Sequence, residues 1–388
     1  MLDRANTIQE QLIAWRRDFH MHPELGFEER RTSAQVARLM EAMGYRVRTG
    51  VGKTGVVAEK GSGKPIAAIR ADMDALPIQE TNQVPYASQT LGVKHACGHD
   101  SHTAMALGVG LLLKDETFPG TVRLLFQPSE EVNDAEGLSG APRMVQDGAL
   151  EGVDMVFALH VDPATPVGDI RIESGPASGG SDAWYARIIG KGGHGARPQD
   201  TVDPFEILGH VIPALYAIPS RRLRPFDPAI VSIGAVHGGQ ADNVIPDTVD
   251  LAGTLRYAER SVQQTIHAEI RHTLELAEFY GGSYELRFDL GLPPMINHPR
   301  TVEIIRAVGA GLLGPEHVLE THKELGAEDF GCFTEVAPGA MFVLGSKIEG
   351  EERYGHNPNF DIDERALPVG AALLAECVLR FLNQEAAR

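Results

Sequence analysis

The sequence is short of cysteine and of uninterrupted apolar runs, and each shortage excludes a class of protein. Its 388 residues include three cysteines, Cys97, Cys332 and Cys377, and no CxxC pair. An odd number of widely spaced cysteines argues against a disulfide framework. The absence of a CxxC pair argues against a structural zinc knuckle. The N-terminus lacks the apolar core of a signal peptide, and no unbroken apolar run has membrane-spanning length. A cytoplasmic protein without a membrane partner is therefore expected.

Positive charge is also scarce. Lysine and arginine number 35 against 53 aspartates and glutamates, which gives a formal net charge of -18. Such a chain is poorly suited to nucleic acid or to anionic lipid, so we expect no nucleic-acid partner and a small molecule or peptide instead. The composition, 43% hydrophobic and 23% charged, is that of a globular protein. Its length suits two domains.

The densest group of potential metal ligands is the stretch KHACGHDSHTA, residues 94–104. Cys97 and His99 stand one residue apart, close enough to hold one metal ion, and Asp100 and His102 follow within reach of the same point. The alternative is a helix N-terminus with Asp100 and Ser101 as caps and solvated histidines.

Further ligand-type side chains follow apolar runs that are typical of buried strands. The runs at 66–71, 122–126 and 155–159 lead into Asp72 and Asp74, into Glu130 and Glu131, and into His160. A fourth run, 340–344, precedes a polar loop that holds His356. Active sites of open α/β sheets lie beyond the carboxyl ends of the strands, so these groups are expected to converge. Five side chains can donate to a metal: Cys97, His99, Glu131, His160 and His356. They suffice for one divalent ion with an open position or for two ions that share a ligand. Zinc, manganese, cobalt and nickel all accept donors of these types.

The pattern changes after residue 175 and predicts an inserted domain. Strands at 182–189, 229–236, 249–256 and 284–290 alternate with helices at 202–217 and 262–280 in the order β-α-β-β-α-β, which is the ferredoxin-like unit. We therefore expect an α/β catalytic domain from residues 1–178 and 295–388, whose central, mostly parallel sheet is flanked by helices, and an α+β domain from 179 to 294. Helices of the catalytic domain are expected at 4–20, 32–43, 107–113, 301–312, 328–335 and 365–382.

Two adjacent carboxylates after one strand point in different directions. Of Glu130 and Glu131, one can bind a metal while the other stays free to move a proton between water and a leaving amine. The residues alone leave open which does which. No GxSxG elbow and no HExxH motif is present.

A set of motifs in fixed order resembles the aminoacylase, hippurate hydrolase and carboxypeptidase family of metal-dependent amidohydrolases, nearest its bacterial N-acyl-amino-acid and plant auxin-conjugate hydrolase branch. The motifs include FHMHPELGFEE, RADMDALP, HACGHDSHTA, FQPSEE, GKGGHGARP, GTLR, GAEDFG and GHNPNFDIDE. The resemblance covers nearly the whole chain. It implies that the five donors named above are metal ligands, that Glu130 is the general base and that Asp74 orients a ligand.

The resemblance also assigns a role to the inserted domain. It implies that His194, Asn243 and Arg256 hold the substrate carboxylate and the oxyanion. It also implies that the domain serves as a lid and pairs chains into a homodimer or higher homo-oligomer, in which the histidine is offered to the neighbouring active site. In much of the wider family a metal-binding histidine matches Asp72, and here Cys97 is implied to replace that ligand. The number and identity of the metals stay open.

The expected function is metal-dependent hydrolysis of the amide bond of an N-acyl amino acid. The same scaffold could instead serve a metallo-carboxypeptidase or dipeptidase. Two further alternatives are a cysteine hydrolase with Cys97 as nucleophile and a non-enzymatic protein that binds carboxylates or stores metal.

Overall fold

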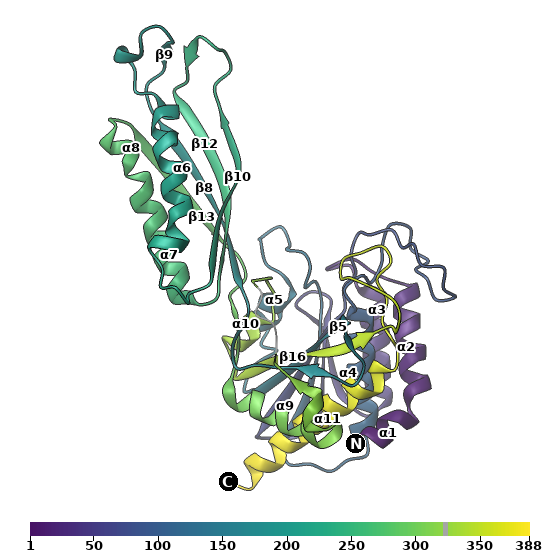
Figure 1. Ribbon diagram of the computed structural model, residues 1–388. Coiled ribbons are helices and arrows are strands. Elements are labelled where there is room, and N and C mark those ends of the chain that lie inside the picture. The colour runs from purple at the N-terminus through teal and green to yellow at the C-terminus, as the bar shows by residue number, and fades with distance from the viewer. Residues whose placement is uncertain (321–324) are drawn as a thin grey trace. The chain divides into compact units, whose positions relative to one another are not determined.

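The computed structural model describes residues 1–320 and 325–388, which form two compact units (Figure 1). The first contains the described residues up to Gly175, those of 296–320 and those of 329–388, and the second contains Pro176–Met295 with residues 325–328. Residues 325–328 were expected in the catalytic domain but group with the second unit, where the Gly179 amide donates to the Gly326 carbonyl at 2.8 Å.

The first unit is built on an eight-stranded mixed sheet. The strand order is β1-β2-β4-β3-β5-β16-β6-β15, and β4, β3, β5 and β16 run parallel to one another while β1 and β2 form an antiparallel edge hairpin. The strands are β1 (Arg46–Val51), β2 (Gly55–Gly61), β3 (Ile66–Asp72), β4 (Thr121–Gln127), β5 (Met155–Pro166), β6 (Ile170–Arg171), β15 (Val318–Leu319) and β16 (Gly339–Lys347). The expected α/β class with a parallel centre is confirmed.

Helices flank this sheet and bury its central strands. They are α1 (Leu2–Thr7), α2 (Gln9–Met21), α3 (Arg30–Ala42), α4 (His99–Leu113), α5 (Gly140–Gln146), α9 (Pro299–Leu312), α10 (Gly331–Thr334) and α11 (Ala366–Ala386). The single helix expected over residues 4–20 is divided at Ile8, and the one expected over 328–335 is limited to α10. These two boundaries of the sequence analysis were wrong.

Helix α4 begins at the ligand-rich stretch and runs through the core, with every residue except Leu111 buried. It packs closely against α11, where a Cβ on Gly370 would lie 2.1 Å from Met105 Sδ and one on Gly108 would lie 3.1 Å from Ala371 Cβ. Helix α11 is long and apolar enough to cross a membrane, but most of its side chains are buried in this core. The close contact of two apolar helices therefore fixes α4 relative to α11.

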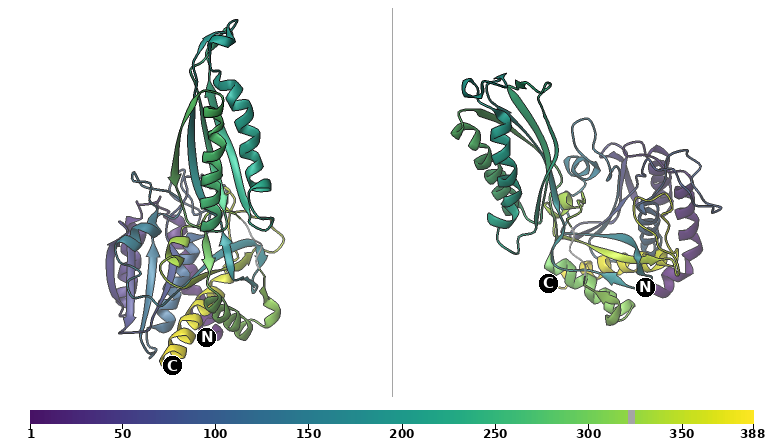
Figure 2. Two further views of the ribbon diagram at one scale, coloured as in Figure 1. Left: turned by 90° about the vertical axis from the view of Figure 1, so that its left-hand side faces the viewer. Right: turned by 45° about the horizontal axis from the view of Figure 1, so that its top comes forward.

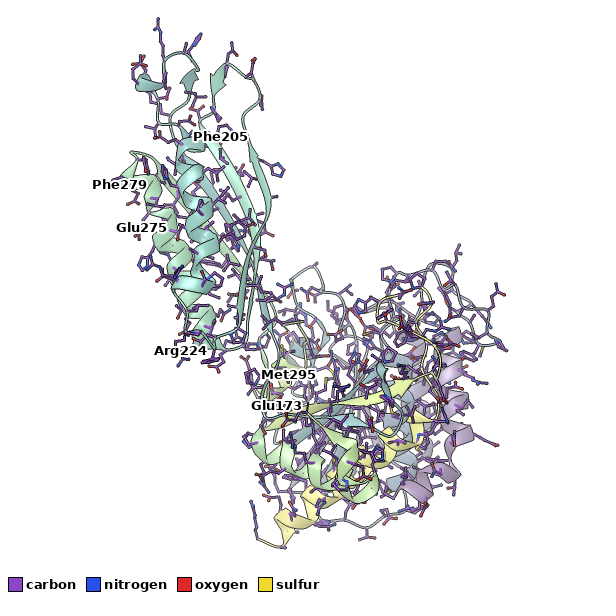
Figure 3. The ribbon with its side chains drawn as sticks, viewed as in Figure 1. Glu173, Phe205, Arg224, Glu275, Phe279 and Met295 are labelled. Atoms are coloured by element: carbon purple, nitrogen blue, oxygen red, sulfur yellow. The ribbon has the colours of Figure 1, made fainter. Side chains whose placement is uncertain are left out.

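The second unit has the ferredoxin-like order that the sequence predicts. Its antiparallel sheet, β10-β12-β8-β13, carries α6, α7 and α8 on one face (Figure 2). The elements are β8 (Gly180–Ile189), α6 (Pro204–Arg221), β10 (Ala229–Gly238), β12 (Thr248–Tyr257), α7 (Arg260–Leu274), α8 (Leu276–Phe279) and β13 (Ser283–Leu290). Figure 3 labels Phe205 near the start of α6 and Phe279 at the end of α8. Two short strands, β9 (Gly193–His194) and β11 (Val244–Ile245), pair beyond the end of this sheet.

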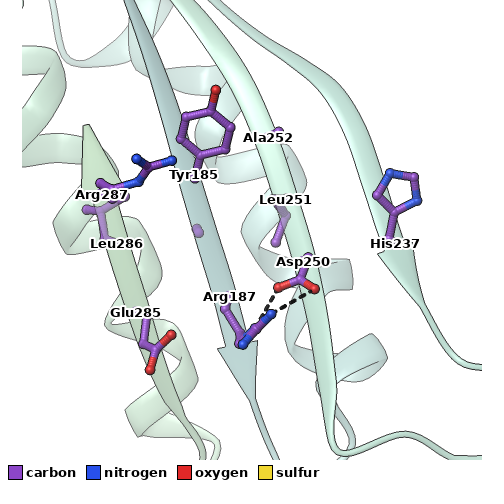
Figure 4. A pocket seen from close by; sticks show the side chains of 10 residues that line it. Tyr185, Arg187, His237, Asp250, Leu251, Ala252, Glu285, Leu286 and Arg287 are labelled. Carbon is purple, nitrogen blue, oxygen red and sulfur yellow. Dashed lines mark hydrogen bonds and ion pairs between the residues drawn. The ribbon is translucent and has the colours of Figure 1, made fainter. Parts of the chain in front are cut away.

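The face of this sheet opposite its helices carries several charged side chains. Figure 4 shows Arg187 of β8 paired with Asp250 of β12, and the Nε to Oδ1 distance is 2.7 Å. Arg287 of β13 lies over the ring of Tyr185, 4.5 Å from its centroid. Arg187 and Asp250 are each about half exposed, so their ion pair contributes little to stability.

A buried carboxylate connects the beginning and the end of this unit. Asp182, at the start of β8, accepts hydrogen bonds from Tyr257 Oη (3.1 Å), Gln263 Nε2 (2.7 Å), His267 Nε2 (2.8 Å) and the amide of Gly291, just after β13 (3.1 Å). Burial alone would raise the pKa of Asp182, but these bonds, His267 first, lower it.

Replacing Asp182 with alanine is expected to destabilise the second unit. Several buried donors would lose their acceptor, at a cost of about 3 kcal/mol in the free energy of unfolding. Asp250→Ala removes an exposed carboxylate from the same sheet and should cost less than about 1 kcal/mol. Denaturant unfolding of both variants measures the difference. Because the pKa of Asp182 is lowered, its contribution should persist at neutral pH and decline only below about pH 4, and equal costs for the two variants would contradict this account.

Candidate metal centre and active site

The parallel strands bring the expected side chains to one edge of the first unit. Strand β3 ends at Asp72, β4 leads into Glu130, and β5 carries His160. Helix α4 begins beside them at His99, and its N-cap Gly98 has a φ of 96°, in the left-handed region. A Cβ on Gly98 would lie 2.3 Å from Val161 Cγ2, so a glycine is needed there both for its backbone angle and for space. The residue therefore lets Cys97 and His99 approach the strand ends.

Cys97, His99 and His160 form a first cluster in which one donor atom from each lies within 4.8 Å of the others. Cys97 Sγ is 3.4 Å from His160 Nε2. The other ring nitrogens are already held, because His99 Nδ1 lies 3.1 Å from Asp74 Oδ1 and His160 Nδ1 lies 2.9 Å from the Val161 carbonyl. Such contacts are the usual way in which a metal-binding imidazole is oriented.

A second cluster uses the same thiol. Donor atoms of Cys97, Glu131 and His356 lie within 4.8 Å of one another, and His356 Nε2 is 2.9 Å from Glu131 Oε1. The His356 amide donates to the Ala96 carbonyl at 2.7 Å, which fixes its loop beside Cys97. The Glu131 amide donates to Asp74 Oδ2 at 3.0 Å. Cys97 is thus common to two groups of three potential ligands.

The electrostatics of both clusters favour anionic donors beside cationic rings. Burial alone would raise the pKa of the Cys97 thiol, but the charges of His160 and His99 lower it to about 6. Contacts with Cys97 and Glu131 raise the pKa of His356 to about 10. A thiolate and a carboxylate this stable need positive charge next to them, and a divalent cation can supply it in place of the protons on the histidines.

The residues present fit a divalent metal. His99 Nε2 is buried and meets no hydrogen-bond partner within the described part of the chain, although it belongs to the first cluster. A buried imidazole nitrogen without a partner is costly unless something else occupies it. One thiolate, three imidazoles and one carboxylate are the donors that zinc, manganese, cobalt and nickel accept. The site therefore offers positions for one ion or, with Cys97 shared, for two.

Two other residues of the ligand-rich stretch, His102 and Asp100, have their side chains held by other partners. His102 Nδ1 lies 2.6 Å from Asp72 Oδ1, and its Nε2 accepts the Val161 amide at 3.0 Å, so both ring nitrogens are used. Burial lowers the pKa of His102 to about 4, which keeps the ring neutral. Asp100 is buried on another side of α4, where its Oδ2 lies 3.0 Å from Arg16 Nε and 2.6 Å from His20 Nδ1.

Asp72 belongs to a buried network of ion pairs. Its Oδ2 pairs with Arg70 Nη1 at 2.6 Å, and Arg70 Nη2 reaches Asp329 Oδ1 at 2.9 Å. Sequence reasoning missed this buried network. The signal was available, because Arg70 lies within an apolar strand and a buried guanidinium needs acidic partners.

The remaining expected residues of the first unit lie where the sequence placed them. Glu130 is half-buried, and its carboxylate falls within 4.8 Å of donor atoms of His99 and Glu131. Asp74 is buried and contacts both His99 and the Glu131 amide. The structure therefore brings together Glu130, Asp74 and all five expected ligands.

The three residues expected to bind substrate are divided within the second unit. His194 and Asn243 are exposed neighbours, since the Gly195 amide donates to the Asn243 carbonyl at 2.8 Å and β9 pairs with β11. Arg256 lies near the far end of β12, opposite Ser181, and donates to the Leu255 carbonyl at 2.8 Å. Strand β12 places roughly 26 Å between Thr248, near the β9–β11 end, and Arg256. The second unit of a single chain therefore cannot bring His194 and Arg256 together on a small substrate.

Comparisons with known proteins agree on one family. Residues 68–380 match the model of peptidase family M20/M25/M40. Thermostable carboxypeptidase 2 of Saccharolobus solfataricus is 37% identical over 389 residues, which is 98% of each chain. An IAA-amino acid hydrolase of Arabidopsis thaliana is 37% identical, covering 98% of this chain and 88% of its own. The N-acetyl-L-cysteine deacetylase of Bacillus subtilis is 36% identical, covering 97% of this chain and 90% of its own.

Solved structures give the same result. A Staphylococcus aureus protein described as a putative aminohydrolase superposes with a TM-score of 0.92 at 34% identity, covering 98% of this chain and 99% of its own. A Bacillus subtilis protein described as a dinuclear metal-binding peptidase of the M20 family superposes with a TM-score of 0.84 at 34% identity, covering 97% and 99%.

The shared thiol leads to a test by metal content. After equilibrium dialysis against one divalent metal, the wild type is expected to hold about two equivalents, His160→Ala about one, and Cys97→Ala less than one. Elemental analysis measures the equivalents. Cys332→Ala removes a thiol outside both clusters and should bind metal as the wild type does. Wild-type protein that binds no metal, yet loses activity on thiol alkylation, would support the cysteine-hydrolase alternative instead.

Proposed function

The chain belongs to the M20/M25/M40 peptidase family, and from that premise we propose that it hydrolyses the amide bond of N-acyl amino acids, releasing a carboxylic acid and a free amino acid. The observation that carries the proposal is the pair Glu130 and Glu131 at the end of β4. Glu131 lies against His356 and Cys97, and the Glu130 carboxylate lies within 4.8 Å of donor atoms of His99 and Glu131. A second carboxylate at this position suits proton transfer, which a protein that only bound metal or carboxylates would not require.

The relatives support this substrate class. The names of two of them, an IAA-amino acid hydrolase and an N-acetyl-L-cysteine deacetylase, describe the removal of an acyl group from an amino acid. A carboxypeptidase is equally similar, and its bond is also an amide next to a free carboxylate. Peptidase activity is therefore the second candidate.

The residues of this chain divide the reaction between them. Cys97, His99, Glu131, His160 and His356 would hold the metal, which when bound supplies a Lewis acid that polarises the carbonyl and lowers the pKa of water. Glu130 takes the proton of the attacking water and returns it to the nitrogen of the leaving amine. A guanidinium such as that of Arg256 suits the substrate carboxylate through two charge-assisted hydrogen bonds, and His194 suits the developing oxyanion.

A homodimer would resolve the separation of these substrate-binding groups. If Arg256 and His194 both contact one substrate, they come from two chains. Exposed apolar side chains support pairing through the second unit: Phe205 and Tyr216 on α6, and Ile230 and Val236 on the edge strand β10. An edge strand with exposed apolar residues is a common site of association. We propose that two copies pair through the second unit and that each offers His194 to the other.

Replacing Glu130 with glutamine tests the proton-transfer role. The amide keeps the size of the side chain but cannot accept the proton, so kcat for an N-acyl amino acid is expected to fall at least about 100-fold, with the metal content unchanged. Glu136→Gln alters an exposed side chain of the same loop and should leave kcat unchanged. Retention of wild-type turnover by Glu130→Gln in metal-loaded protein would refute the role.

Mixed dimers test the pairing. His194→Ala and Arg256→Ala should each be nearly inactive, but coexpressed chains that form hybrids carry one site with both residues intact. Random pairing then restores about one quarter of the wild-type activity. Sedimentation of the wild type as a monomer, or hybrids no more active than the parents, would contradict the proposal.

A further inference from the structure

The residue before Glu130 has an unusual backbone conformation. Ser129 has a φ of 45°, in the left-handed region that a serine rarely adopts. It lies between the end of β4 and the Glu130–Glu131 pair, so its φ and ψ angles set the direction in which the chain presents Glu130. The surroundings must hold this conformation for Glu130 to keep its place.

Close backbone packing surrounds this turn. A Cβ on Gly140 would lie 1.6 Å from the Pro128 carbonyl oxygen, and one on Gly26 would lie 2.3 Å from Ser129 Oγ. The Gly140 amide donates to the Ser129 carbonyl at 2.8 Å. Ser129 itself is fully buried, and its hydroxyl donates to the Val132 carbonyl at 2.8 Å. The carbonyl and the hydroxyl of Ser129 are therefore satisfied locally.

The amide of Ser129 is held by a residue from a distant part of the sequence. Glu29 is fully buried, and its Oε1 accepts the Ser129 amide at 2.8 Å while its Oε2 accepts the Thr54 hydroxyl at 2.5 Å. In the described residues no lysine or arginine forms an ion pair with Glu29. Burial raises its pKa to about 7. Burying a carboxyl group without a neighbouring cation costs free energy, so the position of Glu29 requires an explanation.

A second buried carboxylate completes the arrangement on the other side of Glu130. Asp74 Oδ2 accepts the Glu131 amide at 3.0 Å. The backbone amides of the two residues that flank Glu130 are thus each held by a buried acidic side chain. Glu29 accepts the Ser129 amide, and Asp74 accepts the Glu131 amide. Glu130 itself has its backbone fixed from both neighbours.

We propose that Glu29 is a positioning residue for the general base: by accepting the Ser129 amide, it maintains the left-handed turn that directs the Glu130 carboxylate to the reacting atoms. The proposal rests on the role given to Glu130 above. Glu29 belongs to neither cluster of potential ligands, and its effect is on the orientation of Glu130. A displacement of a catalytic group by about 1 Å can reduce the rate about 100-fold.

Two substitutions at Glu29 separate hydrogen bonding from charge. Glu29→Ala removes the acceptor, so kcat is expected to fall between about 10-fold and 100-fold, with KM changed less than about threefold and the metal content at saturating metal unchanged. Glu29→Gln retains an oxygen for the Ser129 amide and an amide group for Thr54 Oγ1, so it should keep kcat within about threefold of the wild type. Equal losses in both variants would overturn the proposal, because the charge and not the hydrogen bond would then be responsible.

Glu24 provides a matched control for a purely structural effect. It lies five positions earlier, and its Oε1 and Oε2 accept the amides of Arg31 and Thr32 at 2.9 and 2.8 Å, in the first turn of α3. Glu24→Ala should lower the thermal midpoint as Glu29→Ala does, but should leave kcat unchanged. A loss of kcat that follows the thermal midpoint in both variants would show that Glu29 only stabilises the fold.

The turn itself offers a test that does not depend on activity. In metal-loaded protein, hydrogen exchange at the Ser129 amide should be accelerated by Glu29→Ala and not by Glu29→Gln. In a Ser129→Gly background, where the left-handed angle is no longer strained, Glu29→Ala should lose less kcat than it does in the wild type. An unchanged penalty would overturn the proposal. If Glu130→Gln itself remained active, the assigned base would be wrong, and the exchange result would still report whether Glu29 holds the turn.

Discussion

The site depends on the two hydrogen-bonding contacts of the Asp74 carboxylate. Its Oδ1 lies 3.1 Å from His99 Nδ1, and its Oδ2 accepts the Glu131 amide at 3.0 Å. One buried side chain thus orients a donor of the first cluster and places the backbone of a donor of the second. Burial alone would raise the pKa of Asp74, but the contact with His99 lowers it, so the group stays ionised. An uncharged residue of the same shape could not hold both contacts, because it would not accept on both atoms.

Buried ionised groups are costly unless they are paired. In the first unit, the buried arginines near the candidate metal centre each pair with two aspartates. Arg70 lies between Asp72 and Asp329, while Arg16 lies between Asp100 and Asp361, 3.0 and 2.7 Å away. Replacing such networks with apolar residues often preserves or improves stability. Their value here is geometric, since Asp72 fixes the ring of His102, whose Nε2 then holds the backbone amide that follows His160. Stability and placement of the ligands therefore come from the same contacts.

The sequence alone predicted the parts of the fold that have a strong periodic or compositional signal. Strands β3, β4 and β5 are nearly continuous apolar runs because they are buried on both faces, and their ends showed where the ligands converge. The edge hairpin β1–β2 was missed because β1 is largely exposed and rich in arginine. The roles of Asp100 and His102 could not be assigned either. Which side of a helix a residue occupies follows from spacing, but what lies on that side depends on distant segments such as the one that contains Arg16.

The register of the sheet in the second unit separates two of the expected substrate-binding residues. His194 and Arg256 are placed at opposite ends of one sheet by the pairing of β12 with β8, in which Thr248 faces Ile189 and Arg256 faces Ser181. A shift of a few residues would change this distance, and no local pattern specifies it. Once the register is known, the consequence is strong. A rigid antiparallel sheet cannot bend back to bring its two ends onto one small molecule, so the homodimer proposed above draws His194 and Arg256 from separate copies of the chain.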